Sequence, residues 1–179
     1  YNIDLKKLRY VPRGIDMEYF NEDLVDQLWT DQFKIQYNLY DRLIATTVGR
    51  ITPWKGQDDF IRAIGRAQKS NPALIGLIVG GVWHGKESYL EELKRLAASC
   101  NAEIIFTGSH SQLREIYALS DIVISPASTK PETFGRVAAE ALAMNTPVIA
   151  SNHGGVSDIV FPQKKRVIYN PKGFKEMGE

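Results

Sequence analysis

The sequence contains a single cysteine, Cys100, and lacks several features that mark other classes of protein. One thiol cannot form a disulfide within the chain, so a reducing compartment such as the cytoplasm is expected. No apolar run approaches the roughly 20 residues that a membrane-spanning helix needs. A signal peptide is not visible either.

An excess of charge of one sign is also missing. The 22 Lys and Arg nearly balance the 21 Asp and Glu, and the net charge is +1. A nucleic-acid-binding surface is therefore not expected. The sequence has no Asp-x-Asp, and its three His are scattered, so no metal site is expected. It also has no Gly-x-Gly-x-x-Gly after a strand, which disfavours a dinucleotide-dependent oxidoreductase.

What the sequence does contain is an alternation of short apolar runs with amphipathic segments. The apolar runs predict buried strands at residues 43–48, 74–79, 104–107, 122–125, 148–151 and 167–169, with a shorter one at 8–11. Apolar residues at helical spacing predict helices about residues 22–37, 60–67, 87–100, 113–119 and 137–142. This alternation favours one α/β domain, a Rossmann-like parallel sheet with helices on both faces. Ligands of such sheets bind beyond the carboxyl ends of the strands.

The loop at residues 49–56 follows the first main strand and carries Arg50 and Lys55. A guanidinium offers two parallel donors and an ammonium a compact charge, which together suit a pyrophosphate. If the pyrophosphate is a leaving group, both cations would stabilise the charge that develops on it. This loop alone leaves open the alternative that the two cations are simply solvated.

A second loop, at residues 125–135, leads into a helix that is expected to begin near Thr133, a suitable N-cap residue. The free amides of Phe134, Gly135 and Arg136 would then point from the helix end toward an anion or a hydroxyl oxygen. The segment therefore predicts a second ligand-binding element.

Two glutamates, Glu132 and Glu140, lie eight residues apart in and after this loop. Eight helical residues rise about 12 Å, which exceeds the roughly 5–9.5 Å between the carboxylates of a glycoside hydrolase. The pair therefore suits two ends of one extended ligand. The alternative is one loop carboxylate and one unrelated carboxylate on the helix surface.

Taken in order, these segments resemble the carboxy-terminal domain of family 4, or group 1, glycosyltransferases, which have the two-domain GT-B fold. The resemblance covers nearly all of residues 8–160, and a set of motifs in order is more specific than any one of them. The motifs are VPRGID (11–16), VGR (48–50) with KG (55–56), IVGG (78–81), FTGS (106–109), PETFG (131–135) before EA (140–141), and TPVIA (146–150).

The resemblance implies transfer of a hexose from a UDP- or GDP-sugar to an acceptor, with retention of anomeric configuration and without a cofactor or metal. Arg50 and Lys55 match the residues that hold the donor diphosphate, and with Glu132 they are the implied catalytic residues. Glu140 matches the ribose ligand, Glu132 contacts the donor sugar, and Ser109 borders the base. The implied donor site comprises Gly49, Arg50, Lys55, Ser109, Glu132, Thr133, Phe134, Gly135, Arg136 and Glu140.

The resemblance also implies that the chain is half of a larger bacterial enzyme. Residues 1–179 would form a single nucleotide-sugar-binding domain, in which 1–20 leads in from an amino-terminal domain and 161–179 is a truncated end. The opening Tyr1 indicates a fragment. The other domain would bind the acceptor, carry any membrane-facing surface and be required for activity. The full-length protein is expected in the cytoplasm or at the inner face of the plasma membrane, making cell-envelope glycans such as lipopolysaccharide.

Two departures from the family pattern leave an alternative open. Residues 80–85 lack the acidic residue often found after the first glycine, and residues 161–166 lack a Gly-x-Thr-Gly run. A non-catalytic nucleotide-binding or interaction module that kept the fold but lost the reaction would fit the missing glycine run and the truncated ends. A nucleotide-sugar epimerase on a related fold is a further alternative, which the context of Glu132 and Glu140 matches less well.

Overall fold

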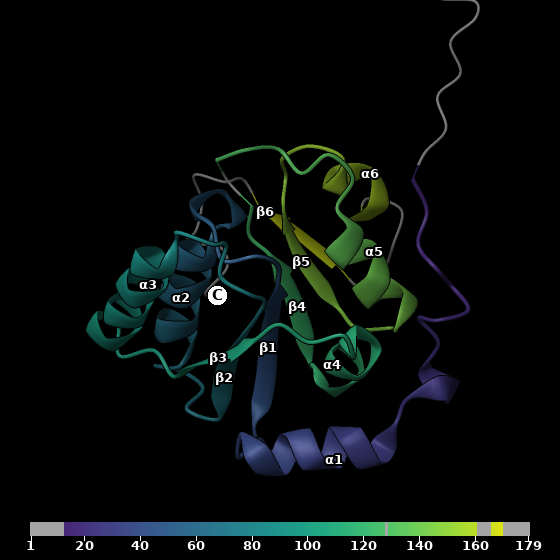
Figure 1. Ribbon diagram of the computed structural model, residues 1–179, viewed down its shortest axis with the longest axis horizontal. Helices are drawn as coiled ribbons and strands as arrows, with labels where there is room; N and C mark the ends of the chain where they lie inside the picture. The colour runs from purple at the N-terminus through teal and green to yellow at the C-terminus, as the bar shows by residue number, and fades with distance from the viewer. Residues whose placement is uncertain (1–12, 128, 161–165, 170–179) are drawn as a thin grey trace, which may run out of the picture.

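The computed structural model describes residues 13–127, 129–160 and 166–169. Its centre is a six-stranded parallel sheet in the order β3-β2-β1-β4-β5-β6 (Figure 1). The strands are β1 (Leu43–Val48), β2 (Leu74–Val79), β3 (Ile104–Gly108), β4 (Ile122–Ser125), β5 (Val148–Ser151) and β6 (Arg166–Tyr169). The Rossmann-like parallel sheet expected from the sequence is confirmed. The strand predicted at residues 8–11 lies outside the described residues.

Helices connect the strands, as the alternating pattern predicts. They are α1 (Gln27–Gln36), α2 (Gln57–Ala67), α3 (Glu87–Ser99), α4 (Leu113–Leu119), α5 (Arg136–Ala143) and α6 (Val156–Val160), with 3-10 turns η2 (Glu22–Leu24) and η3 (Pro53–Lys55). None of the described helices is long and apolar enough to cross a membrane.

The single helix predicted at residues 22–37 is wrong, because the structure divides this segment in two. Asn21 caps the short η2 turn, and a new helix begins only after Asp26. The Asp26 carboxylate accepts a 3.0 Å hydrogen bond from the Trp29 amide, which is the bond that an N-cap residue makes. The cap starts α1 at Gln27 and separates it from η2.

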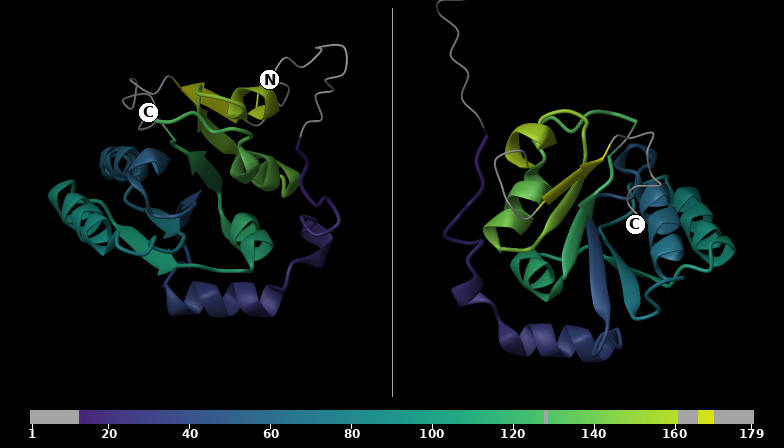
Figure 2. Two further views of the ribbon diagram at one scale, coloured as in Figure 1. Left: turned by 45° about the horizontal axis from the view of Figure 1, so that its top comes forward. Right: turned by 180° about the vertical axis from the view of Figure 1, so that it is seen from behind.

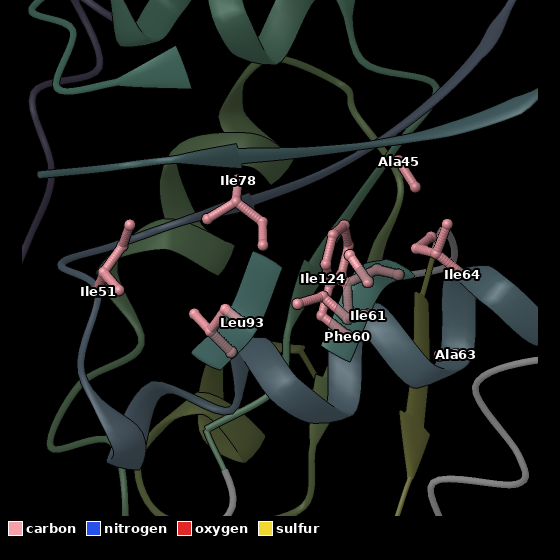
Figure 3. Packing of buried hydrophobic residues seen from close by; sticks show 10 residues of the cluster. Ala45, Ile51, Phe60, Ile61, Ala63, Ile64, Ile78, Leu93 and Ile124 are labelled. Carbon is pink, nitrogen blue, oxygen red and sulfur yellow. The ribbon is translucent and has the colours of Figure 1, made fainter. Parts of the chain in front are cut away.

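Both faces of the sheet are covered, which explains why its strands lack polar alternation. Ala45 and Ile78 point to one face and lie in a buried cluster with side chains of α2 and α3 (Figure 3). The preceding residues, Ile44 and Leu77, point to the other face and are buried with side chains of α1 and α4. Successive side chains of a strand alternate between faces, so strands buried on both faces, such as β1 and β2, are apolar on both.

The helices are divided between the two faces of the sheet. Figures 1 and 2 show α2 and α3 on one side and α4, α5 and α6 on the other. In the same views α1 crosses the end of the sheet at which β1 begins. Buried Phe33 anchors α1 there, with its ring stacked 4.9 Å from that of Trp29.

The order of the strands determines where a ligand site can form. From β1 the chain crosses to α2 and β2 in one direction, whereas from β4 it crosses to α5 and β5 in the other. β1 and β4 are neighbours, so the loops that follow them diverge and leave a crevice. This is the topological switch point at which open α/β sheets bind ligands.

Candidate functional site

A pocket of about 410 Å³ lies at this switch point. Its walls come from the loop after β1, the loop after β4 and the first part of α5. Nine of the ten residues predicted for the site line it, namely Gly49, Arg50, Lys55, Glu132, Thr133, Phe134, Gly135, Arg136 and Glu140. The structure therefore brings together segments that are more than 70 residues apart in the sequence.

Ser109 is the predicted residue that the structure does not place in this lining. It follows β3, which is separated from β1 by β2. Its hydroxyl lies close to Gly81, where a Cβ would come within 2.5 Å of Ser109 Oγ. Ser109 thus borders the loop after β2 rather than the pocket itself.

The loop after β1 begins as a continuation of the sheet. The Gly49 amide donates to the Val79 carbonyl at 2.9 Å, and the Ile51 amide donates to the Gly81 carbonyl at 3.0 Å. Ile51 then forms an isolated parallel bridge with Val82. The hydrogen-bonded ladder between the first two strands therefore extends past their formal ends and fixes the backbone on both sides of Arg50.

The same loop ends at Gly56, which also contacts the loop after β4. Gly56 has φ +72°, in the left-handed region that glycine tolerates best, and it precedes the first residue of α2. A Cβ on Gly56 would lie 2.1 Å from the Pro126 carbonyl oxygen. A glycine here allows the two loops to approach closely.

Lys55 and Glu132 form an ion pair across the pocket, so two predicted ligand-binding groups contact each other. Each side chain is 23% exposed, so both groups remain reachable from solvent. The Glu132 backbone is held in turn by the segment after β5. It forms a parallel bridge with Gly154, and its carbonyl accepts a 2.7 Å hydrogen bond from the Gly155 amide.

The start of α5 differs from the prediction. The helix begins at Arg136, after Gly135 at φ +84° and ψ +43°, so Thr133 is not its N-cap. Gly135 takes this conformation where α6 packs closely, since a Cβ on it would lie 2.8 Å from Val156 Cα. The amides without helical partners therefore start at Arg136 and Val137, both of which line the pocket. The positive end of the α5 dipole still faces the ligand space.

Glu140 is buried, at 4% exposure, and is not the helix-surface carboxylate of the alternative interpretation. The Tyr117 hydroxyl donates to Glu140 Oε2 at 2.7 Å, and Arg136 Nε lies 3.0 Å from Oε1. Burial raises the pKa of the Glu140 carboxyl, while the hydrogen bond from Tyr117 and the charge of Arg136 act to lower it. Burial also raises the pKa of Tyr117 well above its usual value, so its hydroxyl stays a donor.

The 12 Å separation expected for Glu132 and Glu140 does not apply, because only the stretch from Arg136 to Glu140 is helical. Glu132 stands before the helix, in the bridge to Gly154. Both glutamates line the same pocket, as one extended ligand would require.

Three further residues, none of them among the ten predicted for the site, line the pocket or contact its side chains. Tyr117 is buried, and a buried tyrosine hydroxyl needs a polar partner, which here is Glu140. Trp83 is not part of the pocket lining, but the Arg50 guanidinium carbon lies 4.5 Å from its ring centroid. Arg13 was noted only as part of a motif, and it lines the pocket.

Comparison with known proteins agrees with this geometry. The sequence profile of the family described as "Glycosyl transferases group 1" matches residues 30–178. A GDP-mannose-dependent alpha-(1-6)-phosphatidylinositol monomannoside mannosyltransferase of Mycobacterium tuberculosis is 29% identical over 96% of this chain. This chain spans 45% of that enzyme's length, and therefore about half of it.

Solved structures extend the similarity to the fold. A glycosyltransferase from Rickettsia africae superposes with a TM-score of 0.88 and 26% identity, covering 98% of this chain and 46% of its own. Anabaena HepE, solved in complex with UDP and glucose, has a TM-score of 0.82 and 24% identity, covering 92% of this chain and 44% of its own. With most of its length matched by the family profile, and with the sheet and pocket described above, the chain belongs to the group 1 glycosyltransferases.

Proposed function

We propose that this chain binds the nucleoside diphosphate of a UDP- or GDP-sugar and that, within a larger protein, it takes part in transferring the sugar with retention. One observation carries the proposal. Two cations, Arg50 and Lys55, and a buried carboxylate, Glu140, line the same pocket at the switch point of the sheet. Cations suit the diphosphate, and a fixed carboxylate suits the paired hydroxyls of a ribose.

In this proposal each wall of the pocket binds a different part of the donor. Arg50 and Lys55 bind the diphosphate, and Glu140 accepts hydrogen bonds from the ribose. Glu132 and the backbone from Thr133 to Arg136 contact the hydroxyls of the sugar. As the bond between the anomeric carbon and the phosphate oxygen breaks, Arg50 and Lys55 stabilise the negative charge left on the diphosphate. In this role they supply the positive charge that a metal ion supplies in other transferases.

We place the acceptor site outside this chain, in the part of the longer relatives that the chain does not cover. The mycobacterial relative is more than twice as long as the matched region, since the chain covers 45% of it. We propose that an amino-terminal domain binds the acceptor and closes the pocket, and that the isolated chain is inactive without it. A cytoplasmic role in making cell-envelope glycans belongs to the same proposal, because the mycobacterial relative acts on a phosphatidylinositol mannoside.

The test is binding of UDP, GDP, ADP and CMP to this chain, measured by calorimetry on the unaltered protein and on Glu140→Ala. We expect UDP or GDP to bind and Glu140→Ala to weaken that binding. A matched control is Glu115→Gln, because Glu115 is also a buried carboxylate but pairs with Arg114 and does not line the pocket. Absence of binding by all four nucleotides, or equal weakening by both variants, would contradict the proposal.

A further inference from the structure

The Arg50 guanidinium lies over the Trp83 indole, with its central carbon 4.5 Å from the ring centroid. Trp83 belongs to the loop after β2, whose role the sequence left undetermined. It is 51% exposed, although a large apolar ring gains free energy from burial. An exposed tryptophan stacked on a pocket cation therefore calls for a functional explanation.

Backbone geometry explains why these two side chains meet. The ladder between the first two strands continues beyond them, through the hydrogen bond from the Ile51 amide to Gly81 and the bridge from Ile51 to Val82. Ile51 and Val82 both pack into the core cluster on the α2 side of the sheet. In extended backbone adjacent side chains point to opposite sides, so Arg50 and Trp83 project together on the other side.

The contact with Trp83 uses the charge of the guanidinium, which is attracted to the face of the aromatic ring. The group also has five N–H donors in a fixed fork, which suit an anion such as a diphosphate. Lys55 and Arg136 are each paired with a glutamate in the pocket. Across the part of the chain that the structure describes, no carboxylate pairs with Arg50. The N–H donors of Arg50 are thus positioned by Trp83, and no carboxylate of the described residues forms an ion pair with them.

We propose that Trp83 is a positioning residue that holds the Arg50 guanidinium in place for the diphosphate of the donor. This inference rests on the proposed function, since it takes the diphosphate as the ligand of Arg50. Trp83 restricts the rotamers of a long side chain before the ligand arrives, so less conformational freedom is lost on binding. The indole contributes to affinity through Arg50 and makes no contact of its own with the base.

The experiment compares UDP with uridine, and GDP with guanosine, on the unaltered chain and four variants. The variants are Trp83→Leu, Trp83→Phe, Arg50→Ala and the double variant Trp83→Leu/Arg50→Ala. His84→Ala serves as the matched control, because His84 is the exposed neighbour of Trp83 in the same loop. Thermal unfolding of each variant reports whether the fold is kept, as expected for an exposed side chain.

We expect Trp83→Leu to weaken diphosphate binding about two- to fivefold, the size of an exposed cation–π contact, and to leave nucleoside binding unchanged. Trp83→Phe, which keeps an aromatic face, should lose less. In the Arg50→Ala background Trp83→Leu should have no further effect, because the indole then has no guanidinium to hold.

Two results would overturn the inference while leaving the proposed function intact. An equal loss for uridine and UDP would mean that Trp83 stacks on the base. An unchanged affinity in Trp83→Leu, with a loss in Arg50→Ala, would mean that the contact does not position Arg50. If the unaltered chain bound neither UDP nor GDP, the proposed function would fail and the inference with it.

Discussion

The Tyr117 hydroxyl donates a 2.7 Å hydrogen bond to Glu140 Oε2, and this bond joins α4 to α5 beneath the pocket. Arg136 holds the other carboxylate oxygen from one turn earlier in α5. Glu140 is therefore oriented at both oxygens before any ligand binds. Such preorganisation is what a residue that recognises a pair of hydroxyls requires.

Glu140→Ala should weaken binding of a ribonucleoside diphosphate but hardly affect its 2′,3′-dideoxy analogue. Hydrogen bonds to a charged group contribute about 1.5–3 kcal/mol, so the expected loss is roughly 10- to 150-fold. Calorimetric titration of UDP and 2′,3′-dideoxy-UDP into both proteins measures the difference. An identical loss on the two ligands would show that Glu140 does not contact the ribose.

The raised pKa of Glu140 predicts a pH dependence of stability. Burial raises the pKa of its carboxyl in the folded state, whereas the unfolded chain keeps an ordinary value of about 4.3. As pH increases between these two values, the unfolded state loses its proton first, and the free energy of unfolding falls. Glu140→Gln removes this effect, so its stability relative to the unaltered protein should rise with pH across that window and then level off. Urea denaturation at pH steps from 4 to 8 measures it, and a constant difference between the two proteins would count against the shift.

Lys55→Ala should weaken binding of a nucleoside diphosphate much more than binding of the nucleoside. The ammonium would contact the phosphates, and a charge-assisted bond contributes about 1.5–3 kcal/mol. Lys130→Ala is the matched control, because Lys130 lies over the Trp54 ring and is not part of the pocket lining. Titration of UDP and uridine into both variants measures the difference. Equal loss for the two ligands in Lys55→Ala would argue against a diphosphate role.

Glu132→Gln should bind a nucleoside diphosphate without sugar more tightly than the unaltered chain does. Glu132 forms an ion pair with Lys55, and the negative charge of Glu132 would repel a phosphate bound to Lys55. Exposed ion pairs contribute about 0.2–1 kcal/mol, so the gain should be up to about fivefold. Transfer by the full-length protein should fall, since the sugar loses its contact. If UDP bound Glu132→Gln more weakly, the carboxylate would not compete for Lys55.

Gly56→Ala should destabilise the fold more than Gly85→Ala. Both glycines have positive φ, at +72° and +76°, so each substitution adds left-handed strain of roughly 1–2 kcal/mol. A Cβ at Gly85 meets nothing within 4 Å, whereas one at Gly56 would lie 2.1 Å from the Pro126 carbonyl oxygen. The difference between the free energies of unfolding of the two variants measures the cost of the clash with Pro126. Equal values would mean that the two loops can separate freely.

The sheet could be predicted from the sequence because its central strands β1, β2 and β4 are buried on both faces. Burial on both faces requires continuous apolar runs, and runs such as 43–48 are visible without any knowledge of tertiary structure. The cations after β1 could be placed for the same reason, since a strand's carboxyl end fixes which loop faces the switch point.

What could not be predicted depends on contacts between distant segments. Thr133 is a reasonable N-cap by local rules, but the close approach of Val156 holds Gly135 in a left-handed conformation and delays the helix. The local sequence does not show that Tyr117, on another helix, donates a hydrogen bond to buried Glu140. Arg50 finds Trp83 only through the register in which Ile51 pairs with Val82.

The continuation of the β1–β2 ladder through Gly49 and Ile51 has a consequence for recognition. Flexible anion-binding loops lose backbone entropy when they close around a ligand, and that loss subtracts from the affinity. Here the backbone on either side of Arg50 was already immobilised when the sheet formed. We therefore expect this loop to lose less backbone entropy on binding an anion than a flexible loop does.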